Sequence, residues 1–533
     1  MKKSLLGISL LTITGLYGLL AAVIILITLL TDIPVLYGII TSIIILIVQF
    51  LISPFLTDIT MKWFYKAKFN HEIPEYLKNF IEEVCKNNKM KYPRIGYIDD
   101  GAPNAFTYGH TKNNARIVIT RGILELLNEE EVKSVVAHEL GHASHYDMLF
   151  MTVAQLVPLV LYAIYEILLR TDNSSNSDND NSYGAIIGIV AYILYVISNY
   201  ILLALSRTRE YYADSFSLEA TKNPNALASA LVKIGYGLST APKSSKHSAA
   251  SSNALGIFDA KTSKSLVVTS IENNEISKDN IKQAMKWEQW NIWAKWYEIN
   301  STHPLISKRL LAISSRSKEF NQDPYIVFDL KKEESYVDDF LKEAFISFLP
   351  GFTIIVGLIA LLSTLEGETT SILLVTGITL LLFGLSSLLK FSKKYPNKNY
   401  KLAQVKDLLS EVKVSHITAI PCSLEGTIIG RGNPGCIFNE DFVLKDKSGI
   451  IFLDYNQPIK IVNKIFALFL SKEYFDKNIK VTGWYRRSPV PYIELKSMEI
   501  DGKIKKIYTY RFQLVLYIII LIAALLTLGI ALT

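Results

Sequence analysis

The chain has 533 residues, of which 50% are hydrophobic and only 20% charged. This balance argues against a soluble multidomain protein, while 11% aromatic residues and long aliphatic runs exclude a disordered chain. Three cysteines are too few for a disulfide framework or a cysteine zinc site, so a metal would have to be bound by histidines and carboxylates. The net charge of +7 is spread beside apolar segments, and we therefore expect no nucleic-acid partner.

Seven stretches are long and apolar enough to form membrane-spanning helices, because a bilayer core about 30 Å thick needs about 20 apolar residues. They are residues 4–30, 33–55, 148–170, 184–205, 344–364, 369–390 and 512–532. The first stretch lacks a small-residue cleavage site and a second stretch follows at once, so we expect a helix and not a cleaved signal peptide.

The distribution of lysine and arginine predicts the orientation of these spans. Lysines follow the second and the sixth span, whereas the turns at 171–183 and after the fifth span contain no Lys or Arg. By the positive-inside rule, the N-terminus and residues 56–147, 206–343 and 391–511 face the cytoplasm. Seven spans then place the C-terminus outside, and we expect a multi-pass protein of the plasma membrane.

The segments between the spans have a mixed character. Helical spacing covers residues 74–90, strands are predicted at 94–98 and 116–120, and a long helix at 128–147 begins with Asn128 and Glu131 in a capping-box pattern. Helices are also predicted at 206–220 and 281–298. Short runs rich in Val, Ile, Phe and Tyr predict a β domain over about 400–505, in the form of a small OB-like barrel.

The predicted helix 128–147 contains the string HELGH at residues 138–142, an HExxH motif. Residues four apart lie about 40° apart around a helix, so His138 and His142 can reach one ion while Glu139 stands beside it. The chain has only eight histidines, although the same pattern also occurs on plain surface helices. The spacing indicates a two-histidine metal clamp.

A catalytic zinc has three protein ligands and a position for water, so a third ligand must come from another segment. Glu210 is the best candidate, because it lies on the extension of the fourth span, where that helix meets the one carrying His138. Asp214, one turn further, could accept a hydrogen bond from a liganding imidazole. The alternative is that these acids and the neighbouring arginines form an ordinary solvated face of charge pairs.

At this point the sequence resembles a known family, the HtpX-like integral-membrane zinc metalloproteases, which are related to the CAAX prenyl proteases. The resemblance extends over about residues 1–313 and rests on four segments in family order. These are Pro103-Asn104-Ala105-Phe106, HELGH at 138–142, SRTREYYAD at 206–214, and Thr302-His303-Pro304 followed by Arg309-Leu310. The order of the motifs is like that of HtpX, whereas in the CAAX proteases the HExxH comes later.

The resemblance implies one Zn²⁺ per chain with His138, His142 and Glu210 as ligands, and Glu139 as the general base for a zinc-activated water. It also implies supporting roles outside the ligands for Asp214 and Arg207.

Four further residues gain roles from the same resemblance. His303 resembles the family histidine that stabilises the tetrahedral intermediate; the alternative is an ordinary loop residue before a proline. Asn104, Ala105 and Phe106 resemble an edge strand that pairs with extended substrate by β-augmentation. The alternative there is a plain turn and strand capped by Asn104.

These observations predict a multi-pass α-helical membrane protein of about seven spans, with a cytoplasmic α+β zincin domain of the gluzincin type and a small all-β, OB-like C-terminal domain. The expected parts are two spans (1–55), a catalytic lobe with the HExxH (56–147), a hairpin of spans (148–205), a second catalytic lobe (206–343), another hairpin of spans (344–390), the β domain (391–511) and a last span (512–533). The resemblance ends at about residue 313, so it implies no function for the parts beyond.

The predicted function is that of a membrane-embedded zinc endopeptidase in membrane-protein quality control. Its partners would be membrane-protein or peptide substrates and the lipid bilayer, and no oligomeric state is predicted. Two alternatives stay open: a CAAX-type processing protease, and a non-enzymatic membrane scaffold or transporter.

Overall fold

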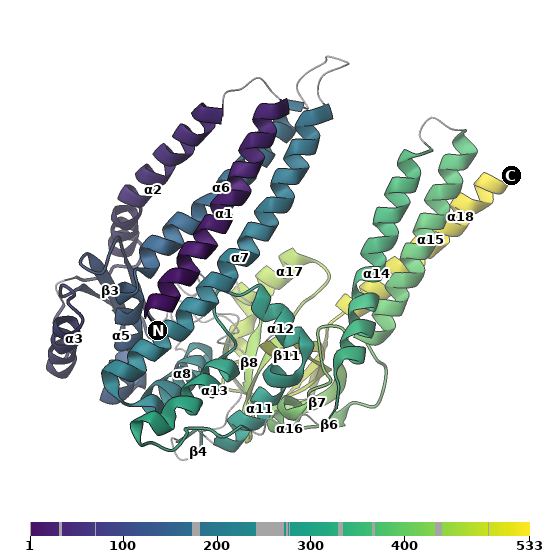
Figure 1. Ribbon diagram of the computed structural model, residues 1–533. Coiled ribbons are helices and arrows are strands. Elements are labelled where there is room, and N and C mark those ends of the chain that lie inside the picture. Colours follow the sequence, from purple (N-terminus) through teal and green to yellow (C-terminus); the bar gives the residue numbers. More distant parts are fainter. Residues whose placement is uncertain are drawn as a thin grey trace. The chain divides into compact units, whose positions relative to one another are not determined.

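A computed structural model describes residues 2–30, 35–69, 71–172, 182–240, 271–272, 275–276, 278–328, 334–364, 368–431, 440–488 and 490–533 (Figure 1). By its internal contacts the chain divides into two compact units. Unit 1 comprises residues 1–241, 250–262 and 298–327, and unit 2 comprises residues 242–249, 263–297 and 328–533.

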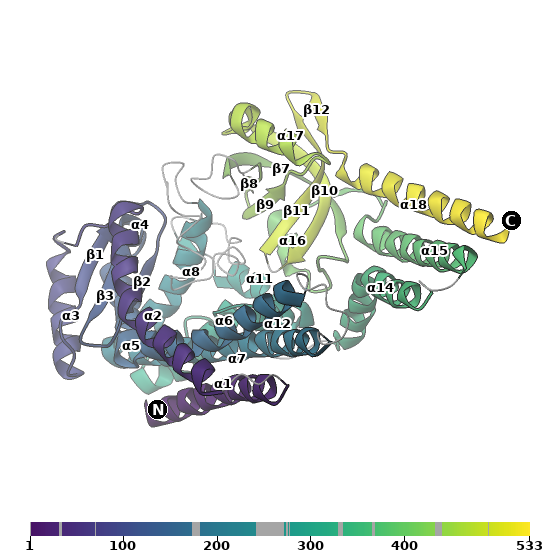
Figure 2. The same cartoon turned by 90° about the horizontal axis from the view of Figure 1, so that it is seen from above.

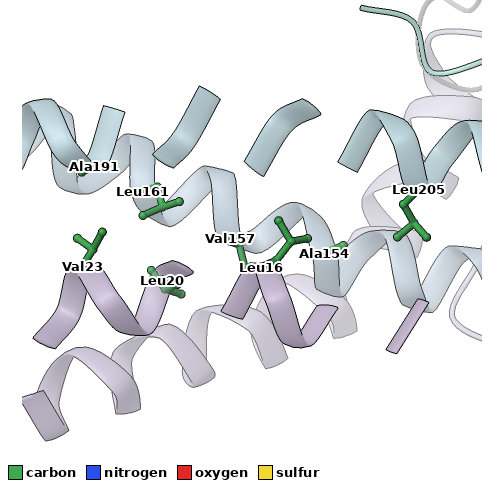
Figure 3. Close-up of a cluster of buried hydrophobic side chains, with 8 residues drawn as sticks. All are labelled: Leu16, Leu20, Val23, Ala154, Val157, Leu161, Ala191 and Leu205. Atoms are coloured by element: carbon green, nitrogen blue, oxygen red, sulfur yellow. The ribbon is translucent and has the colours of Figure 1, made fainter. Parts of the chain in front are cut away.

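Unit 1 contains a group of long apolar helices: α1 (Lys2–Leu30), α2 (Val35–Trp63), α6 (Asp147–Asp172) and α7 (Ser182–Thr221). Helix α1 packs against α6 and α7, as Figure 3 shows for a cluster of aliphatic side chains. The cluster consists of Leu16, Leu20 and Val23 from α1, Ala154, Val157 and Leu161 from α6, and Ala191 and Leu205 from α7. Small alanines at these contacts allow the helices to approach closely.

Beyond these helices, unit 1 forms a three-stranded sheet with helices packed around it. Strand β3 (Ala115–Thr120) lies in the centre, parallel to β1 (Arg94–Ile98) and antiparallel to β2 (Ala105–Gly109). Strand β2 is therefore an edge strand among the described residues. The helical elements are α3 (Glu75–Asn87), α4 (Arg121–Leu126), α5 (Glu129–Ser144), α8 (Pro224–Thr240), α13 (Ile306–Arg316) and the 3-10 turn η2 (Ser317–Phe320). The predicted strands at 94–98 and 116–120 are confirmed.

Helix α5 begins as predicted but ends earlier. Glu131 N donates to Asn128 Oδ1 at 3.0 Å, and Asn128 N donates to Glu131 Oε2 at 2.9 Å, which completes the capping box. The predicted helix continued to residue 147, but Tyr146 has a φ of +59°, in the left-handed region. That conformation ends one helix and allows α6 to begin at Asp147 in a new direction.

Unit 2 begins with a short hairpin, β4 (Ile271–Glu272) and β5 (Glu275–Ile276), and two helices, α11 (Lys278–Trp290) and α12 (Ile292–Ile299). The sequence predicts one helix over 281–298. The helix is interrupted because Asn291 Oδ1 accepts a hydrogen bond from Trp293 N at 2.8 Å, while its Nδ2 donates to Val412 O at 2.8 Å. Such local bonding by asparagine competes with helix continuation.

Three long apolar helices belong to unit 2: α14 (Val337–Leu362), α15 (Thr369–Lys394) and α18 (Thr509–Leu532). Figures 1 and 2 show α15 beside both α14 and α18. Gly377 and Gly384 allow this packing, because a Cβ at either position would collide with Leu528 or Leu521 of α18.

The predicted β domain contains a closed ring of five strands. The strands are β7 (Ile420–Arg431), β8 (Phe442–Lys445), β9 (Ile450–Asp454), β10 (Asn478–Ser488) and β11 (Val490–Ile500). They pair in the order β7-β8-β9-β11-β10 and back to β7, with only β9 and β11 parallel. Short elements complete the domain: β6 (Lys401–Leu402), β12 (Lys503–Lys506), α16 (Val405–Ser410), α17 (Lys460–Ile465), the π-helical turn η3 (Phe466–Leu470) and the 3-10 turn η4 (Ser471–Tyr474).

Six predicted spans are confirmed as helices long and apolar enough to cross a membrane. The residues concerned are 5–27, 147–168, 184–221, 337–362, 369–394 and 509–532. The remaining predicted span, 33–55, falls on helix α2, where many side chains lie outside the described residues, so it stays a prediction. Most of the turn at 171–183 also lies outside the described residues.

Candidate metal centre

The close approach of helices α5 and α7 brings the candidate ligands together. A Cβ at Gly141 would lie 3.1 Å from both Ala213 Cα and Phe216 Cβ, so only glycine allows α5 to press against α7 at this point. The two histidines of the HExxH flank Gly141 along α5, and Glu210 lies one turn before Ala213 on α7. The contact between α5 and α7 therefore brings the side chains of His138, His142 and Glu210 to the same part of the helix interface.

His138, His142 and Glu210 offer ligand atoms that all lie within 4.8 Å of one another. The Nε2 atoms of the two histidines are 3.2 Å apart, and each is 3.5 Å from a carboxylate oxygen of Glu210. Glu210 is buried, and its Oε2 has no hydrogen bond among the described residues. Two imidazole nitrogens beside a buried carboxylate, one oxygen of which has no hydrogen bond among the described residues, are a donor set that fits zinc.

Asp214 supports His138 from the far side of its ring. Its Oδ1 lies 2.9 Å from His138 Nδ1, so the other ring nitrogen is the one that faces His142 and Glu210. Arg309 of α13 binds Asp214 through two hydrogen bonds, Nε to Oδ2 at 2.9 Å and Nη2 to Oδ1 at 2.6 Å. Burial alone would lower the pKa of Arg309, but the two carboxylates outweigh it and raise that pKa above its usual range.

Asp147 supports His142 in the same way, a role that sequence reasoning missed. His142 Nδ1 is 2.6 Å from Asp147 Oδ2, and Arg209 pairs with the other oxygen of this carboxylate. Arg209 also donates to Ser9 Oγ of α1 at 2.7 Å. The sequence shows an acid five residues after the histidine, which is not a helical contact distance; the left-handed Tyr146 brings it back toward the ring.

Glu139 is buried beside the histidines and held by strand β2. Thr107 Oγ1 donates to Glu139 Oε2 at 2.8 Å and lies 3.1 Å from its backbone oxygen. Sequence reasoning also missed Thr107, because a single threonine on a strand carries no signal of its partner. The bond fixes the carboxylate next to the candidate ligands.

The segment before α13 brings His303 to the same centre. His303 Nε2 is 3.5 Å from Glu210 Oε1, and Thr302 Oγ1 is 2.9 Å from its Nδ1. Arg207 does not reach the ligands; its Nη1 donates to the backbone oxygens of Glu298 and Ser301 at 2.9 and 2.8 Å. Arg207 therefore holds the segment that leads to His303.

The predicted substrate-binding residues lie at or beside edge strand β2. Asn104 precedes it, and Asn104 O accepts from Thr120 N at 3.0 Å, which anchors the strand to β3. The side chains of Ala105 and Phe106 are buried, and Phe106 packs in a hydrophobic cluster. Only the backbone of this strand could therefore pair with another chain, while Thr107 connects it to Glu139.

Comparisons with known proteins identify the family of this chain. Residues 73–317 match the model of "Peptidase family M48". The chain is 39% identical over 194 residues to the "Protease HtpX homolog" of Methanothermobacter thermautotrophicus. The matched segment covers 36% of this chain and 70% of that relative. The homologue of Aeropyrum pernix is 27% identical over 49% of this chain and 80% of its own length. For the homologue of Bacteroides fragilis, at 37% identity, the match covers only 29% of this chain and 51% of the relative.

Among solved structures, the "Crystal Structure of S. mikatae Ste24p" aligns with 56% of this chain and 62% of its own, at 17% identity and a TM-score of 0.34. That overall likeness is too low for a comparison of folds. The identity to the Methanothermobacter protease, over more than two thirds of its length, is decisive together with the family match. The chain belongs to peptidase family M48, as one of its HtpX-like members.

Proposed function

We propose that this protein is a zinc-dependent endopeptidase of the plasma membrane, with its active site on the cytoplasmic side. The observation that carries the proposal is the convergence of His138 and His142 on the buried carboxylate of Glu210, whose Oε2 has no hydrogen bond in the described part of the chain. Membership of a metallopeptidase family and six apolar helices support a membrane-associated protease.

The three side chains would hold one zinc ion and leave a position for water. Zinc bound there would lower the pKa of that water and polarise the substrate carbonyl. Asp214 Oδ1 and Asp147 Oδ2 lie 2.9 and 2.6 Å from the outer ring nitrogens of His138 and His142, which leaves the Nε2 atoms available as ligands. A donor set of two nitrogens and one carboxylate oxygen is typical of catalytic zinc.

Glu139 is the general base in this proposal. Its carboxylate takes the proton from the attacking water and returns it to the amine that leaves when the peptide bond breaks. The hydrogen bond from Thr107 orients the carboxylate for both transfers. His303, held by Thr302 and by the segment that Arg207 fixes, stabilises the negative oxygen that forms on the scissile carbonyl.

Substrate would bind as an added strand on β2. The strand has a free edge among the described residues, and its buried side chains leave the backbone as the recognition element. Recognition of backbone is independent of side-chain sequence, which suits an enzyme that removes damaged or misfolded membrane proteins. We therefore propose membrane-protein quality control as the role.

The same proposal extends to the arrangement of the parts. The lobes at 56–147 and 206–343 form a cytoplasmic zincin domain of the gluzincin type, and the C-terminus lies outside. For the region 391–511 we propose an OB-type barrel. Its support is the ring order β7-β8-β9-β11-β10, with a parallel β9–β11 pair and helical turns between β9 and β10.

The test compares detergent-purified wild type with Glu139→Gln and Glu210→Ala in metal content and in cleavage of casein or a membrane substrate. We expect about one zinc in wild type, retained in Glu139→Gln although cleavage falls by about 10² to 10⁴-fold, and lost in Glu210→Ala. Glu130→Gln, at an exposed position of the same helix, is the matched control and should behave as wild type. Wild type without zinc, or cleavage by Glu139→Gln at the wild-type rate, would refute the proposal.

A further inference from the structure

A short segment of the barrel, residues 459–470, presents an apolar surface that nothing in unit 2 covers among the described residues. The segment includes α17 and η3 and connects β9 with the elements before β10. Phe469 is 72% exposed and Ile461 67% exposed. The outward side chains are Ile459, Ile461, Val462, Ile465, Phe469 and Leu470.

The opposite face of this segment is packed firmly into the barrel. Phe466 stacks on Tyr455 with ring centroids 4.0 Å apart, and Arg431 Nη2 donates to Ala467 O at 2.6 Å. Asn463 is buried and accepts a hydrogen bond from Gln457 N at 2.8 Å. A helical segment that is apolar on both faces is expected to be buried on both, so the outer face requires a second apolar environment.

Hydrogen bonds connect Asn456 and Gln457, just before this segment, to the beginning of helix α18 and the residues that lead into it. Tyr508 N donates to Gln457 Oε1 at 3.1 Å, and Gln457 Nε2 donates to Lys506 O at 3.0 Å. Thr509, the first residue of α18, also donates to Asn456 O. Figure 1 shows α17 on the side of the barrel toward which α14, α15 and α18 extend. The apolar surface is thus placed where a span enters the bilayer.

Basic side chains accompany the apolar ones. Lys460 and Lys464 are exposed on α17, and Lys503 and Lys506 are exposed on β12, which leads into α18. Arg511 is exposed in the first turn of α18. Apolar side chains beside lysines are the pattern of helices that lie in the plane of a membrane, where the lysines meet anionic headgroups.

We propose that residues 459–470 lie in the interface of the bilayer that α18 crosses. The six apolar side chains insert between acyl chains, and the lysines contact anionic phospholipid headgroups. The barrel is then attached to the membrane surface at a second point besides its flanking spans. The inference rests on the apolar spans and does not depend on proteolytic activity.

The test places a fluorescent label at Phe469→Cys in the full-length protein, reconstituted in phosphatidylglycerol vesicles. Only Cys436 needs replacement by serine, because Cys85 and Cys422 are buried and burial raises the pKa of their thiols, to about 11 and about 12. The Cys436→Ser protein without Phe469→Cys is the control for labelling at the two remaining cysteines. Lys447→Cys, in the turn at the opposite end of β9, is the matched control.

We expect brominated lipids to quench the label at 469 and iodide in the buffer to leave it unaffected, with the reverse for the label at 447. Equal iodide quenching at both positions would overturn the proposal. Protection at 469 that appears only on addition of a protein substrate, or only at high protein density, would overturn it in favour of a substrate or a second copy. Both variants alter exposed side chains, so neither should prevent folding.

A second arm tests the charge component. Lys460→Glu/Lys464→Glu added to the Phe469→Cys protein should weaken lipid quenching in phosphatidylglycerol vesicles and reduce the difference between phosphatidylglycerol and phosphatidylcholine. Lys445→Glu/Lys447→Glu, with the same change of charge at the other end of the barrel, should have no such effect. Identical quenching in all three proteins would refute the contact with anionic headgroups.

Discussion

Each unit holds a histidine whose pKa is shifted by its surroundings, and the two shifts have opposite signs. In unit 1, burial would lower the pKa of His142, but the hydrogen bond with Asp147 and the neighbouring carboxylates outweigh it and raise the pKa to about 9. In unit 2, burial lowers the pKa of His416 to about 4, and the positive charges of Lys390 and Arg486 act in the same direction.

The difference contrasts the candidate metal centre with a buried histidine that lies beside positive charges. The surroundings of His142 carry excess negative charge, which a proton or a metal ion neutralises. Unit 2 buries charge as well, but Arg486 pairs with Glu494 and Arg487 donates to the backbone oxygen of Ala284 at 2.9 Å. Buried arginine therefore does not indicate a functional site by itself, whereas a cluster of buried carboxylates around two imidazoles marks a candidate one.

The largest expected effect comes from removing one buried arginine from each unit, Arg309 and Arg486. Arg309→Met removes the arginine that pairs with Asp214, and Arg486→Met removes the one that pairs with Glu494, so each should lower the free energy of unfolding by about 3 to 5 kcal/mol. Only Arg309→Met should also lose zinc, because Asp214 then no longer orients His138. Thermal unfolding and metal content of the purified variants check both statements. Zinc retained at the wild-type level in Arg309→Met would contradict the expected difference between Arg309 and Arg486.

The stability of unit 2 should fall as the pH is lowered from about 6.5 to about 4. The pKa of His416 is lower in the folded chain than in the unfolded chain, so the unfolded chain binds the proton first as the pH falls. The free energy of unfolding should therefore be highest above about pH 6.5 and should decrease by up to about 3 kcal/mol as the pH falls to about 4. Unfolding should be followed against pH in wild type and in His416→Asn, which keeps an acceptor for the hydroxyl of Tyr297. Equal pH dependence of the two proteins would contradict the assignment.

A smaller effect is expected for the carboxylate behind His138. Asp214→Asn should weaken zinc affinity by about 10 to 100-fold, because the amide no longer attracts the proton on Nδ1. Glu494→Gln, the corresponding change in unit 2, should leave zinc affinity unaltered. Competition with a fluorescent chelator measures both. Equal losses in the two variants would show that the effect is general destabilisation.

The smallest effect is expected for Thr107→Val. This change removes the hydrogen bond that positions Glu139 and should lower kcat by about tenfold without loss of zinc. Thr427→Val, on strand β7 of unit 2, serves as the control and should not affect kcat. If Thr107→Val also lost zinc, Thr107 would support the candidate zinc ligands and would not act only by positioning Glu139.

Local patterns allowed much of unit 1 to be predicted. Strand β1, the capping box of α5 and the apolar spans all depend on short-range signals that the sequence displays directly. The clustering of His138, His142 and Glu210 followed from helical spacing and from the expectation that two helices meet the membrane together, and the structure brings these side chains together.

Other features depend on contacts that no local pattern encodes. Asp147 reaches His142 only through the left-handed turn at Tyr146, and Thr107 reaches Glu139 only through the packing of β2 on α5. The ring order of the barrel requires pairings between residues of β7 and β10 that are 51 to 65 positions apart, which alternation of side chains cannot specify. The break at Asn291 depends on a partner more than 100 residues away.

The position of Asp147 has a mechanical consequence. The residue is both the first of span α6 and the carboxylate that holds His142, and Arg209 ties it to Ser9 of α1. Spanning helices change tilt with the thickness of the surrounding bilayer. A change in the tilt of α6 would either carry the imidazole of His142 along or break its hydrogen bond with Asp147, so we expect the lipid composition of the membrane to affect the geometry of the candidate metal ligands.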